Sequence, residues 1–438
     1  MFFLTAPDTE RLNIRGSRDP LGFVPLWGHF GRKVVQNLTT SSSSVRGFTT
    51  LLIGLDFAER VAAGESDKEQ VRLEAFLKFE QLAGFARYLR DDTDTDFRGI
   101  TQVKKRVDEG RGKTVSIGAS AELQILSSQK AYGLWGLFIN PAIESGLVVS
   151  KELVLTQEAH EFVDANYTSV FRASGTNTVK AIENLLGSEQ SKLEPAGRHK
   201  QVFESLGRIL GSTVSRRESR FYWDHLVLGG PAGERTGWQP AFVELMSTAG
   251  LEEGEFSYDS LQRIIAKATS PGDVPLRDHL VSIGKLEAFL VAVGNLFEFL
   301  QHRDGADLAE VCRALHEKWG SGLTYLQPDS LEGVEPAIAE VYGDGAAAQR
   351  LIALAGALRH GRYQEAVELT LAHNQFVMNA RHGSQAWIHL SGSKLEVRYR
   401  DDVPKGLRTP SELASAWESN FYINPLKAIK DQLEDGSQ

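Results

Sequence analysis

Apolar residues recur at helical spacing through most of this chain, and this pattern limits the folds that it can adopt. The run from Lys68 to Arg90 is a strong example, and a helix from Val45 to Ala63 precedes it. Such spacing is typical of amphipathic or buried α-helices. Near the end of the chain the period changes to two, in Gln385–Leu390 and Leu395–Tyr399. The sequence therefore predicts a mainly α, multi-helix protein with a small β-hairpin at about 385–399.

The length of 438 residues exceeds what one hydrophobic core usually supports, so two or more domains are expected. The clearest breaker is Gly-Gly-Pro-Ala-Gly at 229–233. This divides the chain into an N-terminal helical domain with a basic surface, residues 1–228, and a C-terminal helical domain, residues 234–438, that carries the hairpin. The short segment 146–149 after a helix resembles part of a winged-helix arrangement in the first domain. The alternative is a plain corner between helices, where glycine ends the helix.

Composition restricts the compartment and the class of protein. The formal net charge of -9 argues against a protein that coats nucleic acid uniformly, although a local basic face remains compatible with it. The single cysteine, Cys312, allows no intrachain disulfide and suits a reducing cytoplasm. No signal peptide is recognisable, and the apolar run 280–300 contains charged residues. We therefore expect a soluble, cytoplasmic protein without a membrane span.

The familiar catalytic and metal motifs are incomplete. Gly112-Lys113-Thr114 resembles the end of a phosphate-binding loop, but Val107 stands where that motif needs glycine. The acidic run 92–96 begins like a calcium loop, but Phe97 and Val103 occupy the positions of its glycine and its last acidic ligand. The histidines lack the spacing of a zinc site, and no Gly-x-Ser-x-Gly elbow occurs. We expect no cofactor, no metal and no catalytic activity.

Two basic clusters are candidates for nucleic-acid binding. They are Lys104, Lys105 and Arg106, and Arg216, Arg217 and Arg220. Arginine can grip phosphate with two parallel hydrogen bonds, and the aromatic run 221–223 could stack on bases. The hypothesis is that both clusters lie on one face. The alternative is that the aromatic residues belong to the core and that the arginines form a solvated face with Glu204 and Glu218.

A tract made only of hydroxyl residues, Thr39 to Ser44, lies between basic side chains. These basic residues are Arg32, Lys33 and Arg46. One interpretation is phosphate binding through the hydroxyls and backbone amides. Another is docking of a protein partner, with Arg32, Lys33 and Arg46 as contacts. The remaining alternative is a solvated loop between two helices.

Several N-terminal pieces carry a family resemblance. These are RGSRDPLG at 15–22, PLWGHFGRKVV at 25–35 and RGFTTLLIGLDFAER at 46–60, with YGLWG at 132–136 and SGL at 145–147 in a similar style. They resemble the N-termini of uncharacterised proteins from bacterial anti-phage defence islands. The resemblance implies ATPases, helicases and nucleases as neighbours, and hence a non-catalytic subunit that binds DNA or such a partner. The alternatives are a nucleic-acid-processing enzyme with an unrecognised site and a protein-only scaffold or regulator.

Overall fold

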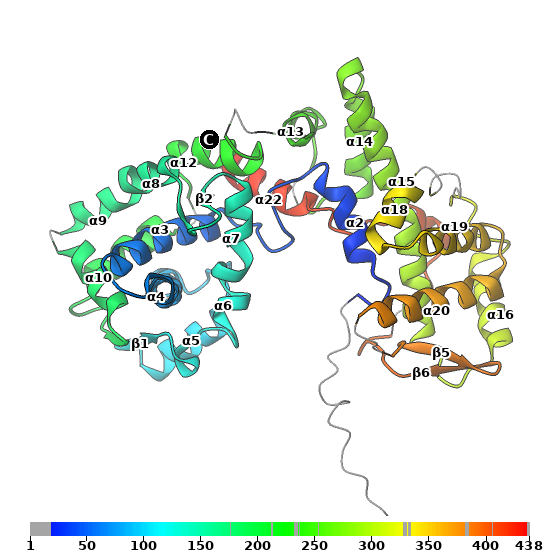
Figure 1. The fold of residues 1–438 in the computed structure, drawn as a ribbon, viewed down its shortest axis with the longest axis horizontal. Coiled ribbons are helices and arrows are strands. Elements are labelled where there is room, and N and C mark those ends of the chain that lie inside the picture. Colours follow the sequence, from blue (N-terminus) through cyan, green and yellow to red (C-terminus); the bar gives the residue numbers. More distant parts are fainter. Residues whose placement is uncertain are drawn as a thin grey trace, which may run out of the picture. The chain divides into compact units, whose positions relative to one another are not determined.

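The computed structural model describes residues 19–175, 177–211, 213–231, 235, 237–252, 254–326, 331, 334–381, 385–404 and 406–435. Within them the chain is mainly helical, as the apolar spacing predicts (Figure 1). It divides into two compact units, each built from separate stretches of the chain. Unit 1 consists of 1–32, 245–251 and 256–421, and unit 2 of 33–244, 252–255 and 422–438.

This division differs from the expected boundary at 229–233, because packing and not chain order decides it. The segment around α2 (Phe23–Arg32) packs with residues far along the chain: the Phe30 and His279 rings stack 5.7 Å apart. Gly31 also lies so close to Phe421 that an added Cβ would sit 2.5 Å from the Phe421 carbonyl oxygen. The described part of the breaker, residues 229–231, therefore lies within unit 2.

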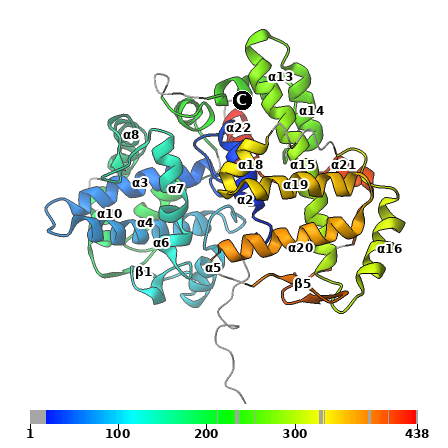
Figure 2. The same ribbon diagram turned by 45° about the vertical axis from the view of Figure 1, so that its right-hand side comes forward.

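Unit 2 is organised around two long helices that lie side by side, α3 (Val45–Ala62) and α4 (Lys68–Arg90) (Figures 1 and 2). Gly54 permits their close approach, since a Cβ there would sit 2.8 Å from the Phe79 ring. Phe57 stacks on Phe79 with ring centroids 5.8 Å apart. Because both faces of α3 are covered, almost all of its residues are buried.

The other elements of unit 2 surround this pair. The helices are α5 (Ile100–Glu109), α6 (Gln129–Tyr132), α7 (Leu134–Glu144), α8 (Gln157–Val163), α9 (Ser169–Ser174), α10 (Thr178–Gly187), α11 (Lys200–Ile209), α12 (Arg216–Tyr222) and α22 (Ile423–Asp435). Short 3-10 or π turns are η1 (Ala121–Leu123), η2 (Asp164–Thr168) and η3 (Trp223–Val227), and α13 (Gln239–Thr248) spans the division between the units. Two antiparallel pairs join β1 (Val115–Gly118) to β4 (Gln190–Leu193) and β2 (Val148–Val149) to β3 (Val154–Leu155). In the segment 146–149, the candidate wing, only Val148 and Val149 form a strand, and they pair with Leu155 and Val154.

Unit 1 is built around the long helix α15 (Val274–Leu300). Its other elements are α14 (Tyr258–Lys267), η4 (Pro271–Asp273), α16 (Leu308–Trp319), α18 (Glu335–Tyr342), α19 (Gly345–Arg359), α20 (Tyr363–Ala380) and α21 (Pro410–Ala414). The stretch Pro271–Leu300 is long and apolar enough to cross a membrane, but 72% of its most apolar window is buried inside the structure. That burial is consistent with the core helix of a soluble protein.

The predicted C-terminal hairpin is confirmed. Strand β5 (Ile388–Ser391) pairs antiparallel with β6 (Lys394–Val397), in the register Ile388↔Val397 to Ser391↔Lys394. Gly392 occupies the turn with a φ of 65°, a left-handed conformation that glycine adopts without steric cost. The period-two pattern alone was enough to locate this element.

The turn at 19–22, part of the first N-terminal piece, is hydrogen-bonded to α20 in unit 1. The α20 residues His373 and Asn374 bind its backbone: His373 Nε2 lies 2.9 Å from the Leu21 carbonyl oxygen, and Asn374 donates to that of Pro20 at 2.8 Å. Burial lowers the pKa of His373 to about 4, so this imidazole is neutral at pH 7 and belongs to the core. Residues 19–22 of the first N-terminal piece therefore have a packing role.

Candidate functional site

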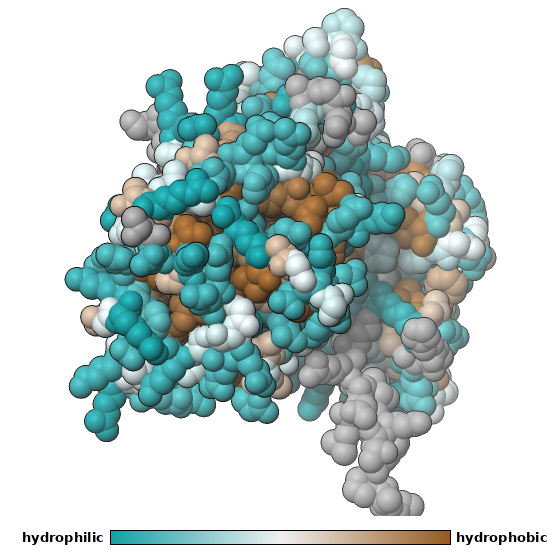
Figure 3. All heavy atoms as spheres, turned by 60° about the vertical axis from the view of Figure 1, so that its left-hand side comes forward, coloured by the Kyte–Doolittle hydropathy of each residue, from teal (hydrophilic) through white to brown (hydrophobic). Residues whose placement is uncertain are grey.

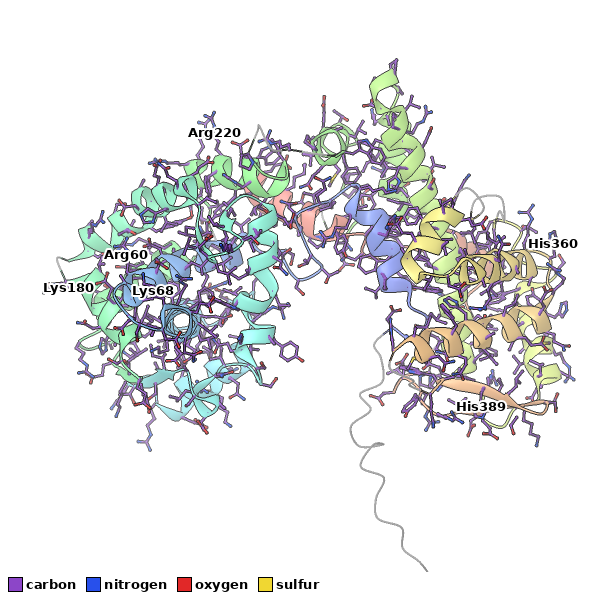
Figure 4. The ribbon with its side chains drawn as sticks, in the orientation of Figure 1. Arg60, Lys68, Lys180, Arg220, His360 and His389 are labelled. Carbon is purple, nitrogen blue, oxygen red and sulfur yellow. The ribbon has the colours of Figure 1, made fainter. Side chains whose placement is uncertain are left out.

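The three arginines of α12 form an exposed row. The helix begins with a capping box, in which the Glu218 N–H donates to Ser215 Oγ at 3.3 Å and the Ser215 N–H donates to Glu218 Oε2 at 2.7 Å. Glu218, Ser219 and Tyr222 form the buried face. Arg216, Arg217 and Arg220 are exposed, and none of them pairs with an acidic residue in the part of the chain that the structure describes. Figure 4 shows Arg220 at the outer edge of unit 2.

A buried polar network fixes the inner face of α12. Arg46 Nη1 lies 2.7 Å from Glu218 Oε1, and Arg46 Nε donates to the Gly211 carbonyl at 2.7 Å. Tyr167 donates to the same carboxylate oxygen at 2.7 Å, while Tyr222 donates to Thr49 at 3.0 Å. Burial alone raises the pKa of the Glu218 carboxyl. The charge of Arg46 and the hydrogen bonds outweigh burial, so the pKa lies below its ordinary value.

This network corrects the expectation for Arg46 as a partner contact. Its side chain is 6% exposed, and its guanidinium is occupied by Glu218 and by the backbone carbonyls of Gly211 and Thr213. Of the other two predicted contacts, Arg32 is the half-buried last residue of α2, and Lys33 is an exposed turn residue at the start of unit 2. Arg46 is therefore a structural residue.

The second basic cluster lies apart from α12. Lys104 and Lys105 are exposed on α5, and Lys105 Nζ is 3.9 Å from Glu109 Oε1. Arg106 instead donates to the carbonyls of Glu122 at 2.8 Å and Gln124 at 2.7 Å, so it holds the loop around η1. Helices α5 and α12 occupy opposite sides of unit 2 in Figure 1. The hypothesis that both clusters form one face is therefore wrong.

Phe221 and Tyr222, which follow Arg220, pack against the Phe162 ring, as the alternative interpretation expects, whereas Trp223 is half-buried. Phe221 stacks on Phe162 with centroids 3.7 Å apart, and Tyr222 is fully buried. The Phe162 ring covers one face of Phe221, and burial keeps Tyr222 from stacking on a base. The acidic residues of that alternative are placed differently: Glu218 is buried against Arg46, and Glu204 lies 3.7 Å from Lys200 on α11.

The hydroxyl tract lines a cavity of about 240 Å³ in unit 2. Ser41, Ser43 and Ser44 contribute to its rim, and Ser44 also caps α3 and donates to Asp96 Oδ2 at 3.2 Å. The remaining walls come from α3, α4, α7 and the loop after α4. They are Gly47, Thr50, Glu80, Ala83, Gly84, Arg87, Thr95, Asp96, Phe97, Arg98, Leu134 and Phe138. The cationic residues that line this cavity with the tract are thus Arg87 and Arg98, whereas Arg32, Lys33 and Arg46 are not part of the lining.

Glu80 is the buried carboxylate of this cavity lining, and the part of the cavity next to it is called the inner end. Glu80 is 4% exposed; its Oε1 accepts from the Leu134 N–H and its Oε2 from Gln129 Nε2, both at 2.7 Å. Gly133 allows this approach, because a Cβ there would sit 2.6 Å from Glu80 Oε2. Burial raises the pKa of Glu80 to about 7, although the two hydrogen bonds and the charge of Arg98 lower it. Gly133 and Leu134 of the YGLWG piece thus hold the buried Glu80 carboxyl at the start of α7.

A second groove, of about 610 Å³, adjoins the cavity and shares Arg87, Thr95 and Asp96 with it. Arg87 is engaged there by Asp94, with Nε–Oδ2 and Nη2–Oδ1 distances of 2.7 and 2.9 Å. The acidic loop that resembles a calcium site therefore neutralises an arginine. No group of three or more potential metal ligands occurs among the described residues.

Comparisons with known proteins give no family for this chain. No family model matches it, and no curated protein or solved structure is significantly similar to it.

Replacing Arg46 tests whether the network is structural. Arg46→Ala leaves Glu218 buried without its cation, so unfolding should become easier by about 3–5 kcal/mol. Arg216→Ala, a matched control on the exposed side of α12, should change stability by less than about 0.5 kcal/mol. Urea unfolding followed by circular dichroism compares the two. Equal stability of both variants would contradict the structural role of Arg46.

The pKa of Glu80 predicts a pH dependence. Between its ordinary value of 4.5 and about 7 the folded state binds more protons than the unfolded state, so stability falls as pH rises. Glu80→Gln removes this titration. Relative to that variant, the wild type should lose about 2–3 kcal/mol between pH 5 and pH 8. Urea unfolding at both pH values measures the difference, and a difference that does not change with pH would rule out a raised pKa.

Proposed function

We propose that this protein is a cytoplasmic, non-catalytic subunit of a bacterial multiprotein anti-phage defence system, and that it binds nucleic acid. The observation that carries the nucleic-acid part is the row Arg216, Arg217 and Arg220. These guanidinium groups are exposed, and no ion pair occupies them among the described residues. Their helix is held from its other face by Glu218 and Tyr222. A rigid support with free cations suits phosphate contacts.

The negative net charge is compatible with this proposal. Interactions between exposed charges fall off over a Debye length of about 8–10 Å, so local potential matters more than the sum over 438 residues. Three arginines within two helical turns can contact adjacent phosphates of one strand. Because Tyr222 is buried and Phe221 is stacked on Phe162, the contact reads the backbone and should show little preference for sequence.

The resemblance of the N-terminal pieces supports the defence-system part. A helicase, ATPase or nuclease is the partner that it implies. Figure 3 shows a face on which hydrophilic side chains dominate and smaller apolar patches interrupt them. Such patches suit a protein partner, while the exposed arginines suit nucleic acid.

Salt-dependent binding tests the proposal. Fluorescence anisotropy with labelled duplex and single-stranded DNA should show affinity that falls with salt, by a log–log slope of about 0.9 for each duplex phosphate neutralised. In the variant R216A/R217A/R220A, the magnitude of this log–log slope should decrease by about 2–3 for duplex DNA. Thermal unfolding should remain nearly unchanged, because exposed charges contribute little to stability.

A charge-matched variant is the control. K104A/K105A/K113A removes three positive charges from exposed positions on and just after α5, on the other side of unit 2. It should leave the slope close to that of the wild type. Equal losses in both variants would show that overall charge, and not α12, drives binding. Absence of salt-sensitive binding by the wild type to either form of DNA would overturn the nucleic-acid proposal.

A further inference from the structure

We propose that the cavity beneath the hydroxyl tract is a binding site for a nucleoside, with the base directed to Glu80 and the sugar at the serine rim. This site is independent of the α12 arginines and of the function proposed for them. Three observations carry it: the size of the cavity, the change from a buried acid to partly exposed hydroxyls along its lining, and the pairing of its charged residues.

The size limits the ligand to a small molecule. A volume of about 240 Å³ lies just below the range of roughly 300–1,000 Å³ that is usual for drug-sized ligands. A folded peptide or a stretch of duplex would not enter. The inner wall is apolar, with Ala83, Leu134 and Phe138 all buried, and half-buried Phe97 adds a second ring. A flat heteroaromatic ring is the shape and polarity that such a wall accommodates.

At the inner end of the cavity, Glu80 can accept hydrogen bonds from N–H donors of a ligand. Each oxygen of Glu80 accepts one hydrogen bond from the protein, from Leu134 or Gln129, and each retains capacity for another. Those two bonds also fix the orientation of the carboxylate. Guanine presents two adjacent N–H groups on one edge, a match for both carboxylate oxygens. Adenine and cytosine offer an amino group, and the single N–H of uracil is flanked by carbonyls that a carboxylate repels.

The outer part suits hydroxyl groups better than a phosphate. Ser41, Ser43 and Ser44 line it and are partly exposed. Arg87 is paired with Asp94, and the charge of Arg98 acts on the Glu80 carboxyl, whose pKa it lowers. Glu80 and Asp96 are carboxylates in the same lining. An added phosphate would therefore gain little, whereas a ribose can exchange hydrogen bonds with serine hydroxyls.

Isothermal titration calorimetry of the full chain with guanosine, adenosine, cytidine, uridine and guanosine monophosphate tests this site. Guanosine should bind most tightly and uridine at least tenfold more weakly. The monophosphate should bind no more tightly than guanosine. Ser43→Phe should fill the rim and abolish guanosine binding, while Thr40→Phe, an exposed neighbour in the same tract that does not line the cavity, should leave it unchanged. Glu80→Gln should weaken guanosine binding at least tenfold.

Three results would overturn the proposal. One is no heat of binding for any nucleoside at millimolar concentration. A second is guanosine binding that survives Ser43→Phe, which would place the ligand elsewhere; this variant remains informative even if Glu80→Gln fails to fold. The third is tighter binding of every monophosphate, regardless of base, with loss in Arg98→Ala, which would identify a phosphate site instead.

Discussion

The buried ion pair between Arg46 and Glu218 fixes the orientation of α12 and hence of the three exposed arginines on it. It joins α3 to α12 across 172 positions in the sequence. Taking two charges out of water is costly unless further hydrogen bonds satisfy them. Here the carbonyls of Gly211 and Thr213 complete the guanidinium, and Tyr167 and the Ser215 N–H complete the carboxylate. Because the inner face of α12 is fixed in this way, its three arginines point outward.

The pKa of each of three buried glutamates depends on the groups that bind its carboxylate. Glu218 has a cation beside it, and its pKa lies below the ordinary value. Glu80 receives hydrogen bonds from a backbone N–H and an amide, and burial raises its pKa to about 7. Glu287 in unit 1 accepts from the backbone N–H groups of Glu418 and Ser419, and burial raises its pKa as well. Hydrogen bonds from neutral donors, even with the charge of Arg98 added at Glu80, do not offset the loss of solvent, whereas a guanidinium that is hydrogen-bonded to the carboxylate does so at Glu218.

The helices and the C-terminal hairpin could be predicted because their periodicity is a local property of the sequence. The candidate site could be predicted only in part. Arg46 and Arg216 look alike in the sequence, and tertiary packing alone makes one structural and the other exposed. Glu80 carried a signal, since it follows Phe79 within an apolar helical run, but the Leu134 N–H that it binds lies 54 residues away. Glycine and proline residues around helix α18 interrupt the helical pattern there, so the sequence alone does not predict this helix.

Arginine-specific modification with phenylglyoxal, read by mass spectrometry with and without duplex DNA, tests the central claim most directly. The account predicts that Arg216, Arg217 and Arg220 react in the free protein and are protected by DNA. Arg46 should stay unreactive in both samples, since Glu218 and two carbonyls enclose its guanidinium. Ready modification of Arg46 in the folded protein, or equal modification of the α12 arginines with and without bound DNA, would contradict the account.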